Sequence, residues 1–106
     1  MPTLEQMNAR LPGTLPGYLG IEILTIDGGH VDARLPIRPE LLAPNGFLHA
    51  ASVVALADTA CGFGAVANLP DGARGFTTIE LKTNFLGTAH EGTLTCEATL
   101  MHGGRT

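Results

Sequence analysis

The chain has 106 residues, of which 44% are hydrophobic and 15% are charged, and its net charge is −4. This composition indicates one small globular domain over 1–106 rather than a disordered chain. Only six residues are Lys or Arg and only 5% are aromatic, so a nucleic-acid-binding surface is not expected. The first residues lack the apolar run of a signal peptide, and the two cysteines are expected to be reduced thiols in a cytoplasmic protein.

The first half of the chain predicts a short helix followed by a β-hairpin. The helix is expected over Glu5–Leu11, before Pro12 and Gly13. The β-branched segment Tyr18–Ile26 predicts a strand, and the following Asp-Gly-Gly predicts a turn. The segment His30–Leu35 alternates between apolar and polar residues, which predicts a second strand with one apolar face, made by Val31, Ala33 and Leu35.

The second half predicts a loop, one long helix and two more strands. The loop is Pro36–Gly46, with three prolines and an Asn-Gly pair, and the helix runs from Ala50 to about Asn68. Strands are expected over Phe76–Phe85 and Thr93–Met101. The order β-β-α-β-β, with one apolar face on each strand, predicts an antiparallel sheet that covers one helix.

The long helix has apolar or very small residues at nearly every position, which predicts a helix buried on all sides. It is not expected to span a membrane, because His49 and Asp58 lie within its apolar stretch. A lone carboxylate among apolar residues is costly unless it is paired, so Asp58 is a candidate catalytic residue. The alternative is a structural hydrogen bond or a place at the helix surface.

His49 stands where the loop becomes the helix, so the N–H of Ala50 is a candidate donor to an oxyanion. The alternative is that His49 only caps the helix or packs. Nine residues separate His49 from Asp58, which puts them on opposite sides of a helix and roughly 13 Å apart. One substrate would then meet both only across a two-fold axis between two copies. The spacing also argues against a pair of His49 with Cys61, which is expected to be a small buried residue.

The four histidines show no spacing typical of a metal site, and no Gly-rich phosphate loop is present, so neither a metal nor a cofactor is expected.

Two segments, PNGFLHAASVVALADTACGFGA and TTIELKTNFLGTAHEG, resemble the hotdog-fold acyl-CoA thioesterases of the phenylacetate-pathway and 4-hydroxybenzoyl-CoA type. The resemblance begins near Tyr18 and implies an α+β hotdog fold, in which an antiparallel sheet wraps around a central helix. Family members usually continue for two strands beyond a segment like Thr93–Thr106. The chain is therefore expected to lack the last strands of the family's sheet.

The resemblance also implies roles for individual residues. The family's acidic nucleophile or general base falls at Asp58. The family's His-Gly-Gly, whose first glycine N–H polarises the thioester carbonyl, is His49-Ala50-Ala51 here. Many family members have an Asn or Gln six residues before the histidine. This position is Ala43 here, and Asn45 is a nearby amide that can fill the role. The hydroxyl that some members supply from the next strand falls at Thr78. Three further residues are candidates for substrate binding, the last two through CoA phosphates: Thr77, Arg74 and Lys82.

These features predict hydrolysis of a small acyl-CoA, either aryl-acyl or short to medium in chain length, to a free acid and CoA. Two alternatives stay open: a hotdog hydratase or dehydratase acting on acyl thioesters, and a non-catalytic acyl-CoA-binding module. The expected partner is a second copy that shares each site, and family members commonly pair such dimers into tetramers. The pattern leaves open the acyl group, the role of Asp58 as nucleophile or base, and the choice between dimer and tetramer.

Overall fold

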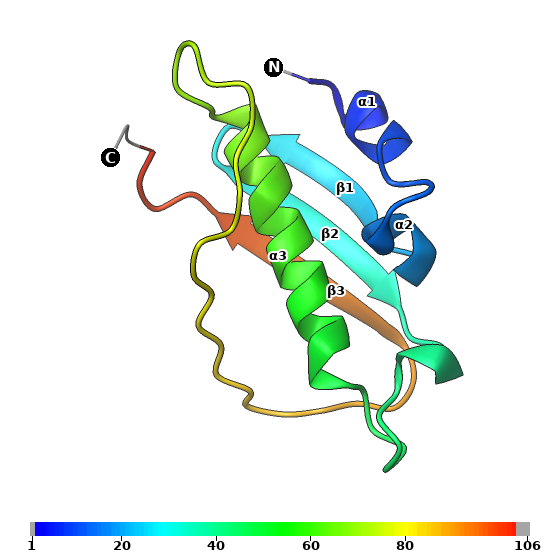
Figure 1. Ribbon diagram of the computed structural model, residues 1–106. Helices are drawn as coiled ribbons and strands as arrows, with labels where there is room; N and C mark the ends of the chain where they lie inside the picture. Colours follow the sequence, from blue (N-terminus) through cyan, green and yellow to red (C-terminus); the bar gives the residue numbers. More distant parts are fainter. Residues whose placement is uncertain (1, 104–106) are drawn as a thin grey trace.

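A computed structural model describes residues 2–103, which form one antiparallel sheet packed against one long helix (Figure 1). The helices are α1 (Leu4–Ala9), α2 (Leu15–Leu19), the 3-10 turn η1 (Pro39–Leu41) and α3 (Ala50–Ala67). The strands are β1 (Glu22–Asp27), β2 (His30–Pro36) and β3 (Thr93–Thr99), in the sheet order β1-β2-β3. The expected α+β class, with an antiparallel sheet over a central helix, is confirmed.

The hairpin forms where the sequence predicts it. Asp27 lies opposite His30, and Gly28 between them has a φ of +59°, a left-handed conformation that glycine adopts without strain. Strand β2 is the centre of the sheet, because it pairs with β1 on one side and with β3 on the other. The two faces of β2 therefore decide what the sheet buries and what it exposes.

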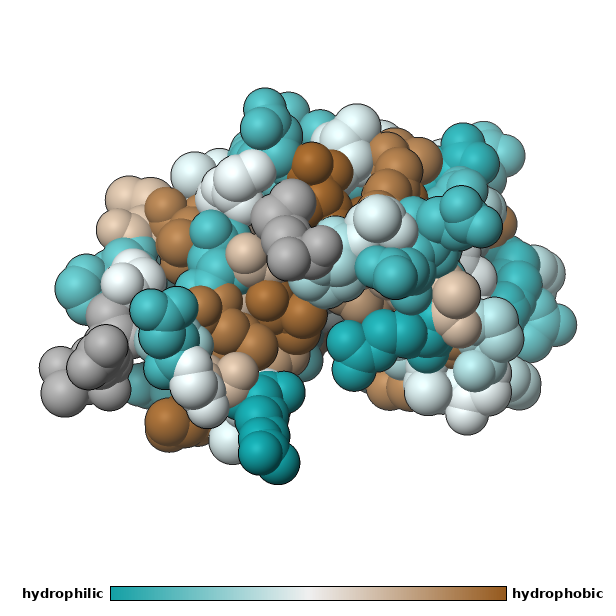
Figure 2. Space-filling model, turned by 90° about the horizontal axis from the view of Figure 1, so that it is seen from above, coloured by the Kyte–Doolittle hydropathy of each residue, from teal (hydrophilic) through white to brown (hydrophobic). Residues whose placement is uncertain are grey.

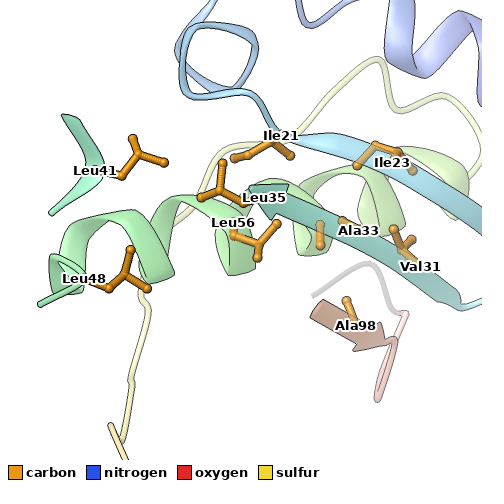
Figure 3. Close-up of a cluster of buried hydrophobic side chains, with 10 residues drawn as sticks. Ile21, Ile23, Val31, Ala33, Leu35, Leu41, Leu48, Leu56 and Ala98 are labelled. Atoms are coloured by element: carbon orange, nitrogen blue, oxygen red, sulfur yellow. The ribbon is translucent and has the colours of Figure 1, made fainter. Parts of the chain in front are cut away.

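The core lies between the inner face of the sheet and α3, as Figure 3 shows. The predicted apolar face of β2 is confirmed, since Val31, Ala33 and Leu35 are each at most 1% exposed. The helix contributes Leu56 and Ala60 to the same cluster. Burial of these side chains supplies the main driving force for joining helix and sheet.

Two strand predictions need correction. Strand β1 begins at Glu22 rather than Tyr18, because the preceding residues form α2, which has a proline in its first turn and ends at Gly20 with a φ of +93°. No strand forms over Phe76–Phe85, although the segment is extended beside α3 in Figure 1. Strands need hydrogen-bonded neighbours, and the backbone from Phe76 to Thr88 has no such partner within residues 2–103.

The sheet covers α3 on one side only. The buried residues of α3 are Ser52, Leu56, Ala60, Gly62 and Gly64, whereas Ala51 and Cys61 of the same helix are exposed. The prediction of a helix buried on all sides is therefore wrong for the single chain, because three strands cover only one face. By length and composition α3 would also suit a membrane span. The core helix of a globular fold shares that property, and the sheet packs against this helix.

Replacing Leu35 by Ala is expected to lower the free energy of unfolding by about 2–5 kcal/mol, because the fully buried side chain leaves a cavity. Urea unfolding followed by circular dichroism measures the change. The matched control is Leu15→Ala at a residue that is 64% exposed, where a change within about 0.5 kcal/mol is expected. Equal losses in both variants would show that the contact between helix and sheet is not the main source of stability.

Candidate active site

His49 is the N-cap of α3. Its Nδ1 accepts a hydrogen bond from the N–H of Ala51 at 2.9 Å, which satisfies one of the free donors at the start of the helix. A ring that accepts at Nδ1 carries its proton at Nε2 when it is neutral. The Nε2–H is thus left to donate to another group. His49 therefore does cap the helix, as the alternative in the sequence analysis expected. The same hydrogen bond places the proton of the neutral ring on Nε2, which is the tautomer that could donate to a carbonyl oxygen.

The N–H of Ala50 makes no hydrogen bond within residues 2–103, and Ala50 is exposed. The Oδ1 of Asn45 accepts from the N–H of Phe47 at 3.1 Å, which holds the turn before the helix. Asn45, His49 and Ala50 line one cavity of about 430 Å³ together with Ala43. We refer to Asn45, His49 and Ala50 as the helix-start cluster, because all three line this cavity and each carries a hydrogen-bond donor.

Asp58 lies in the middle of α3 and is half-buried. The hydroxyl of Thr78 donates a hydrogen bond to its Oδ1 at 2.9 Å. This contact holds one carboxylate oxygen and leaves the other available. We refer to Asp58 and Thr78 as the mid-helix cluster.

The mid-helix cluster depends on a close approach one helical turn further on. A Cβ at Gly62 would lie 2.7 Å from Cζ of Phe76, so an alanine there would push the aromatic ring away from its present place on the helix. Asp58 and Gly62 are four residues apart on one helix face, while Phe76 and Thr78 are two apart on an extended segment. The two contacts therefore align the segment with the helix, and this explains a glycine where alanine would suit the helix better.

The N-terminal segment forms one wall of a cavity of about 290 Å³ beside Asp58, which the sequence analysis did not anticipate. Asn8 fixes that segment to the sheet, because its side chain makes two hydrogen bonds to the backbone of Ile23, at 2.9 and 3.0 Å. The lining residues are Arg10, Leu11, Thr14, Pro16, Asp58, Thr59, Gly62, Phe63, Val66 and Phe76. The sequence did not indicate that the N-terminal segment lines this cavity, because no motif links Arg10–Pro16 to the helix.

The two clusters line separate cavities in the single chain. This agrees with the helical spacing, which keeps His49 and Asp58 apart. Of the remaining candidates, Arg74, Thr77 and Lys82 are exposed, and no hydrogen bond or ion pair within residues 2–103 joins them to either cluster. The Nζ of Lys82 donates instead to Oδ1 of Asn84 at 3.3 Å.

The cysteines differ from expectation in one respect. Cys61 is exposed rather than buried, and it lines a cavity with Ala98 and Thr99 at the edge strand β3. Cys96 is half-buried on the inner face of β3, where burial raises the pKa of its thiol. A raised pKa keeps Cys96 protonated and is the opposite of what a nucleophilic thiolate needs.

A further cavity, of about 470 Å³ and with mainly apolar walls, adjoins the helix-start cluster at Ala50. Its walls include Val53 of α3, Leu94 of β3, and Phe85 and Leu86 of the extended segment. Several large apolar side chains of that segment are exposed, among them Phe76, Ile79 and Leu86. Hydrophobic atoms also reach the surface among polar ones in Figure 2. The molecule thus offers apolar surface close to both clusters.

A family model described as Thioesterase superfamily matches residues 45–106, which include both clusters. The protein ComA2 of Bacillus subtilis is 34% identical over 93 residues, which are 88% of the chain and 74% of that protein. The 1,4-dihydroxy-2-naphthoyl-CoA hydrolase of Escherichia coli is 30% identical over 92 residues, which are 85% of the chain and 65% of that protein.

Solved structures agree with the sequence matches. The crystal structure of a thioesterase from Haemophilus influenzae superposes with a TM-score of 0.89 at 28% identity, covering 99% of the chain and 73% of that structure. A mutant thioesterase from Pseudomonas aeruginosa gives a TM-score of 0.92 at 28% identity, covering 100% and 76%. The chain therefore belongs to the Thioesterase superfamily and has the hotdog fold of its thioesterases.

Proposed function

We propose that the protein hydrolyses the thioester of a small acyl-CoA, aryl-acyl or short to medium in length, to the free acid and CoA. The observation that carries the proposal is the Asp58 carboxylate, held by the Thr78 hydroxyl at the wall of a cavity. The hydrolase of Escherichia coli, named for an aromatic acyl-CoA, supports this substrate class. The apolar cavity next to Ala50 offers space for the acyl group.

The helix-start cluster would bind the thioester carbonyl. The N–H of Ala50 has no hydrogen-bond partner among residues 2–103 and lies at the positive end of the α3 dipole, and the Nε2–H of His49 is a second donor. Donors placed there stabilise the negative charge that develops on the carbonyl oxygen in the transition state. Asp58 would then either attack the carbonyl carbon or take a proton from an attacking water. In both routes the C–S bond breaks and CoA leaves as a thiolate. When Asp58 attacks, the acyl group is left on its carboxylate as an anhydride, which water then hydrolyses to the free acid; when Asp58 acts as a base, the attacking water gives the free acid directly.

Each site would combine the helix-start cluster of one subunit with Asp58 of the partner subunit. Three observations support a shared site: the clusters line separate cavities, the sheet covers α3 on one side only, and the backbone of Phe76–Thr88 is unpaired within residues 2–103. Pairing that segment with its own copy would satisfy its backbone and bury the apolar side chains that it exposes.

Asp58→Asn is expected to lower kcat for acyl-CoA hydrolysis by at least about 10²-fold, because the amide can neither attack nor accept a proton. Thiol release from phenylacetyl-CoA and from short- and medium-chain acyl-CoAs measures the loss. Asp71→Asn, which changes an exposed aspartate in a turn, is the matched control and should keep full activity. Near-normal turnover in Asp58→Asn, or hydration of an enoyl-CoA without thiol release by the unaltered protein, would contradict the proposal.

Thr78→Val is expected to lower kcat about tenfold with little change in KM, because it removes the hydroxyl that orients Asp58 while keeping the shape of the side chain. Thr95→Val, on the outer face of β3, makes the same chemical change away from both clusters and should have no effect. Steady-state kinetics of the two variants provide the comparison. Equal kcat values would show that the hydrogen bond to Asp58 has no catalytic role.

Mixing two inactive variants tests the shared site. One variant carries His49→Ala with Ala50→Pro, which removes the donors, and the other carries Asp58→Asn. In a mixed dimer both lesions fall in one site and the other site is intact, so up to about half of the sites recover. Native mass spectrometry establishes that the subunits have exchanged. If exchange is complete and activity stays at the level of the separate variants, each site lies within one subunit.

A further inference from the structure

The outer face of the sheet carries a group of metal-ligating side chains on the side away from α3. His30 and Asp32 are two residues apart on β2, so both point away from the core that Val31 enters. Glu97 of β3 lies directly opposite Asp32 in the antiparallel register. Neither cluster of the candidate active site includes any of these residues.

The three side chains converge. Nε2 of His30 lies 2.9 Å from Oδ1 of Asp32. One ligand atom from each of His30, Asp32 and Glu97 lies within 4.8 Å of the other two. In a four-coordinate zinc site with metal–ligand bonds of about 2.0–2.2 Å, neighbouring ligand atoms lie about 3.4 Å apart. The exposed Glu97 side chain would therefore have to move closer to His30 and Asp32 to bind the same ion.

Threonines on the flanking strands orient two of the three ligands. The hydroxyl of Thr25 on β1 donates to Oδ2 of Asp32 at 2.6 Å, which leaves Oδ1 facing His30. The hydroxyl of Thr99 on β3 lies 3.3 Å from Nδ1 of His30. A histidine that binds a metal through Nε2 carries its proton on Nδ1, and the hydroxyl oxygen of Thr99 can accept a hydrogen bond from that N–H.

The charge of the group is unbalanced. Two carboxylates directly opposite each other on neighbouring strands repel, and the hydroxyl of Thr25, followed by His30, keeps the pKa of Asp32 below its usual value. Arg34 on the same face is paired with Glu22 instead. His30 itself pairs with Asp32 at 2.9 Å when its ring is protonated, and within residues 2–103 no Lys or Arg forms an ion pair with Asp32 or Glu97, so Glu97 has no cationic partner there. A bound cation would supply the missing positive charge.

We propose that His30, Asp32 and Glu97 bind one divalent cation of the zinc type on the outer face of the sheet. One imidazole nitrogen and two carboxylate oxygens suit a borderline metal such as Zn²⁺, and water completes a four-coordinate site. Because β2 and β3 both supply ligands, the ion would tie the two strands together. The sequence did not reveal the site, because Glu97 is 97 − 32 = 65 residues after Asp32 and only the strand register joins them.

Titration of the purified chain with zinc chloride in a calorimeter tests the proposal, and the expected result is one Zn²⁺ bound per chain. His30→Ala and Glu97→Gln are each expected to weaken Zn²⁺ binding at least about tenfold. Replacing a residue that only hydrogen-bonds to a metal ligand already lowers metal affinity by about that factor. Zn²⁺ is also expected to raise the Tm of the unaltered chain and not of these variants, because a ligand of the native state stabilises it. Both substitutions lie on the outer face of the sheet, and circular dichroism confirms that the variants fold.

Two matched controls separate this site from other zinc ligands. His90 also stands beside a carboxylate, with Nε2 3.9 Å from Oε1 of Glu91, but those two residues belong to no three-residue group within residues 2–103. Cys61 offers an exposed thiol. His90→Ala and Cys61→Ser should therefore bind Zn²⁺ like the unaltered chain. The proposal is overturned if the unaltered chain binds no Zn²⁺, or if His30→Ala and Glu97→Gln bind it as tightly as the controls do.

Discussion

The inner face of β2 packs directly on α3, and the positions of the helix-start cluster and the mid-helix cluster follow from that contact. Val31 and Leu35 of the strand are fully buried together with Leu56 and Ala60 of the helix. A helix of 18 residues is about 27 Å long and behaves as a rigid rod on this scale. Once the sheet fixes its middle, His49 at its start and Asp58 further along have no freedom to meet within one chain.

The same contact leaves much of α3 outside the sheet. The extended segment after the helix covers part of it, through the ring of Phe76 on Gly62 and the hydroxyl of Thr78 on Asp58. The segment itself exposes large apolar side chains and an unpaired backbone within residues 2–103. An isolated chain of this size buries a modest core, so association that covers this surface would add stability as well as complete a site.

The two faces of the sheet have different chemistry because side chains alternate along a strand. On β2 the odd-numbered residues Val31, Ala33 and Leu35 enter the core, while His30, Asp32 and Arg34 stay on the outer face. The outer face makes ion pairs and hydrogen bonds between strands, as between Arg34 and Glu22. One strand can thus hold the helix that carries the candidate active site and also carry a separate polar group, with no contact between the two.

Local patterns in the sequence predicted those elements that depend on residues close together in the chain. The alternation over His30–Leu35, the Asp-Gly-Gly turn and the proline-free run after His49 predicted the hairpin and α3. The spacing of His49 and Asp58 predicted that the two residues lie apart, and they line different cavities. Only the tertiary structure decided what depends on partners distant in the chain. Phe76–Phe85 has the pattern of a strand but no neighbouring strand within residues 2–103, and α3 has an apolar composition although the sheet covers only one of its faces. The cavity wall from the N-terminal segment and the pairing of Asp32 with Glu97 come from packing and strand register, which no single stretch of sequence encodes.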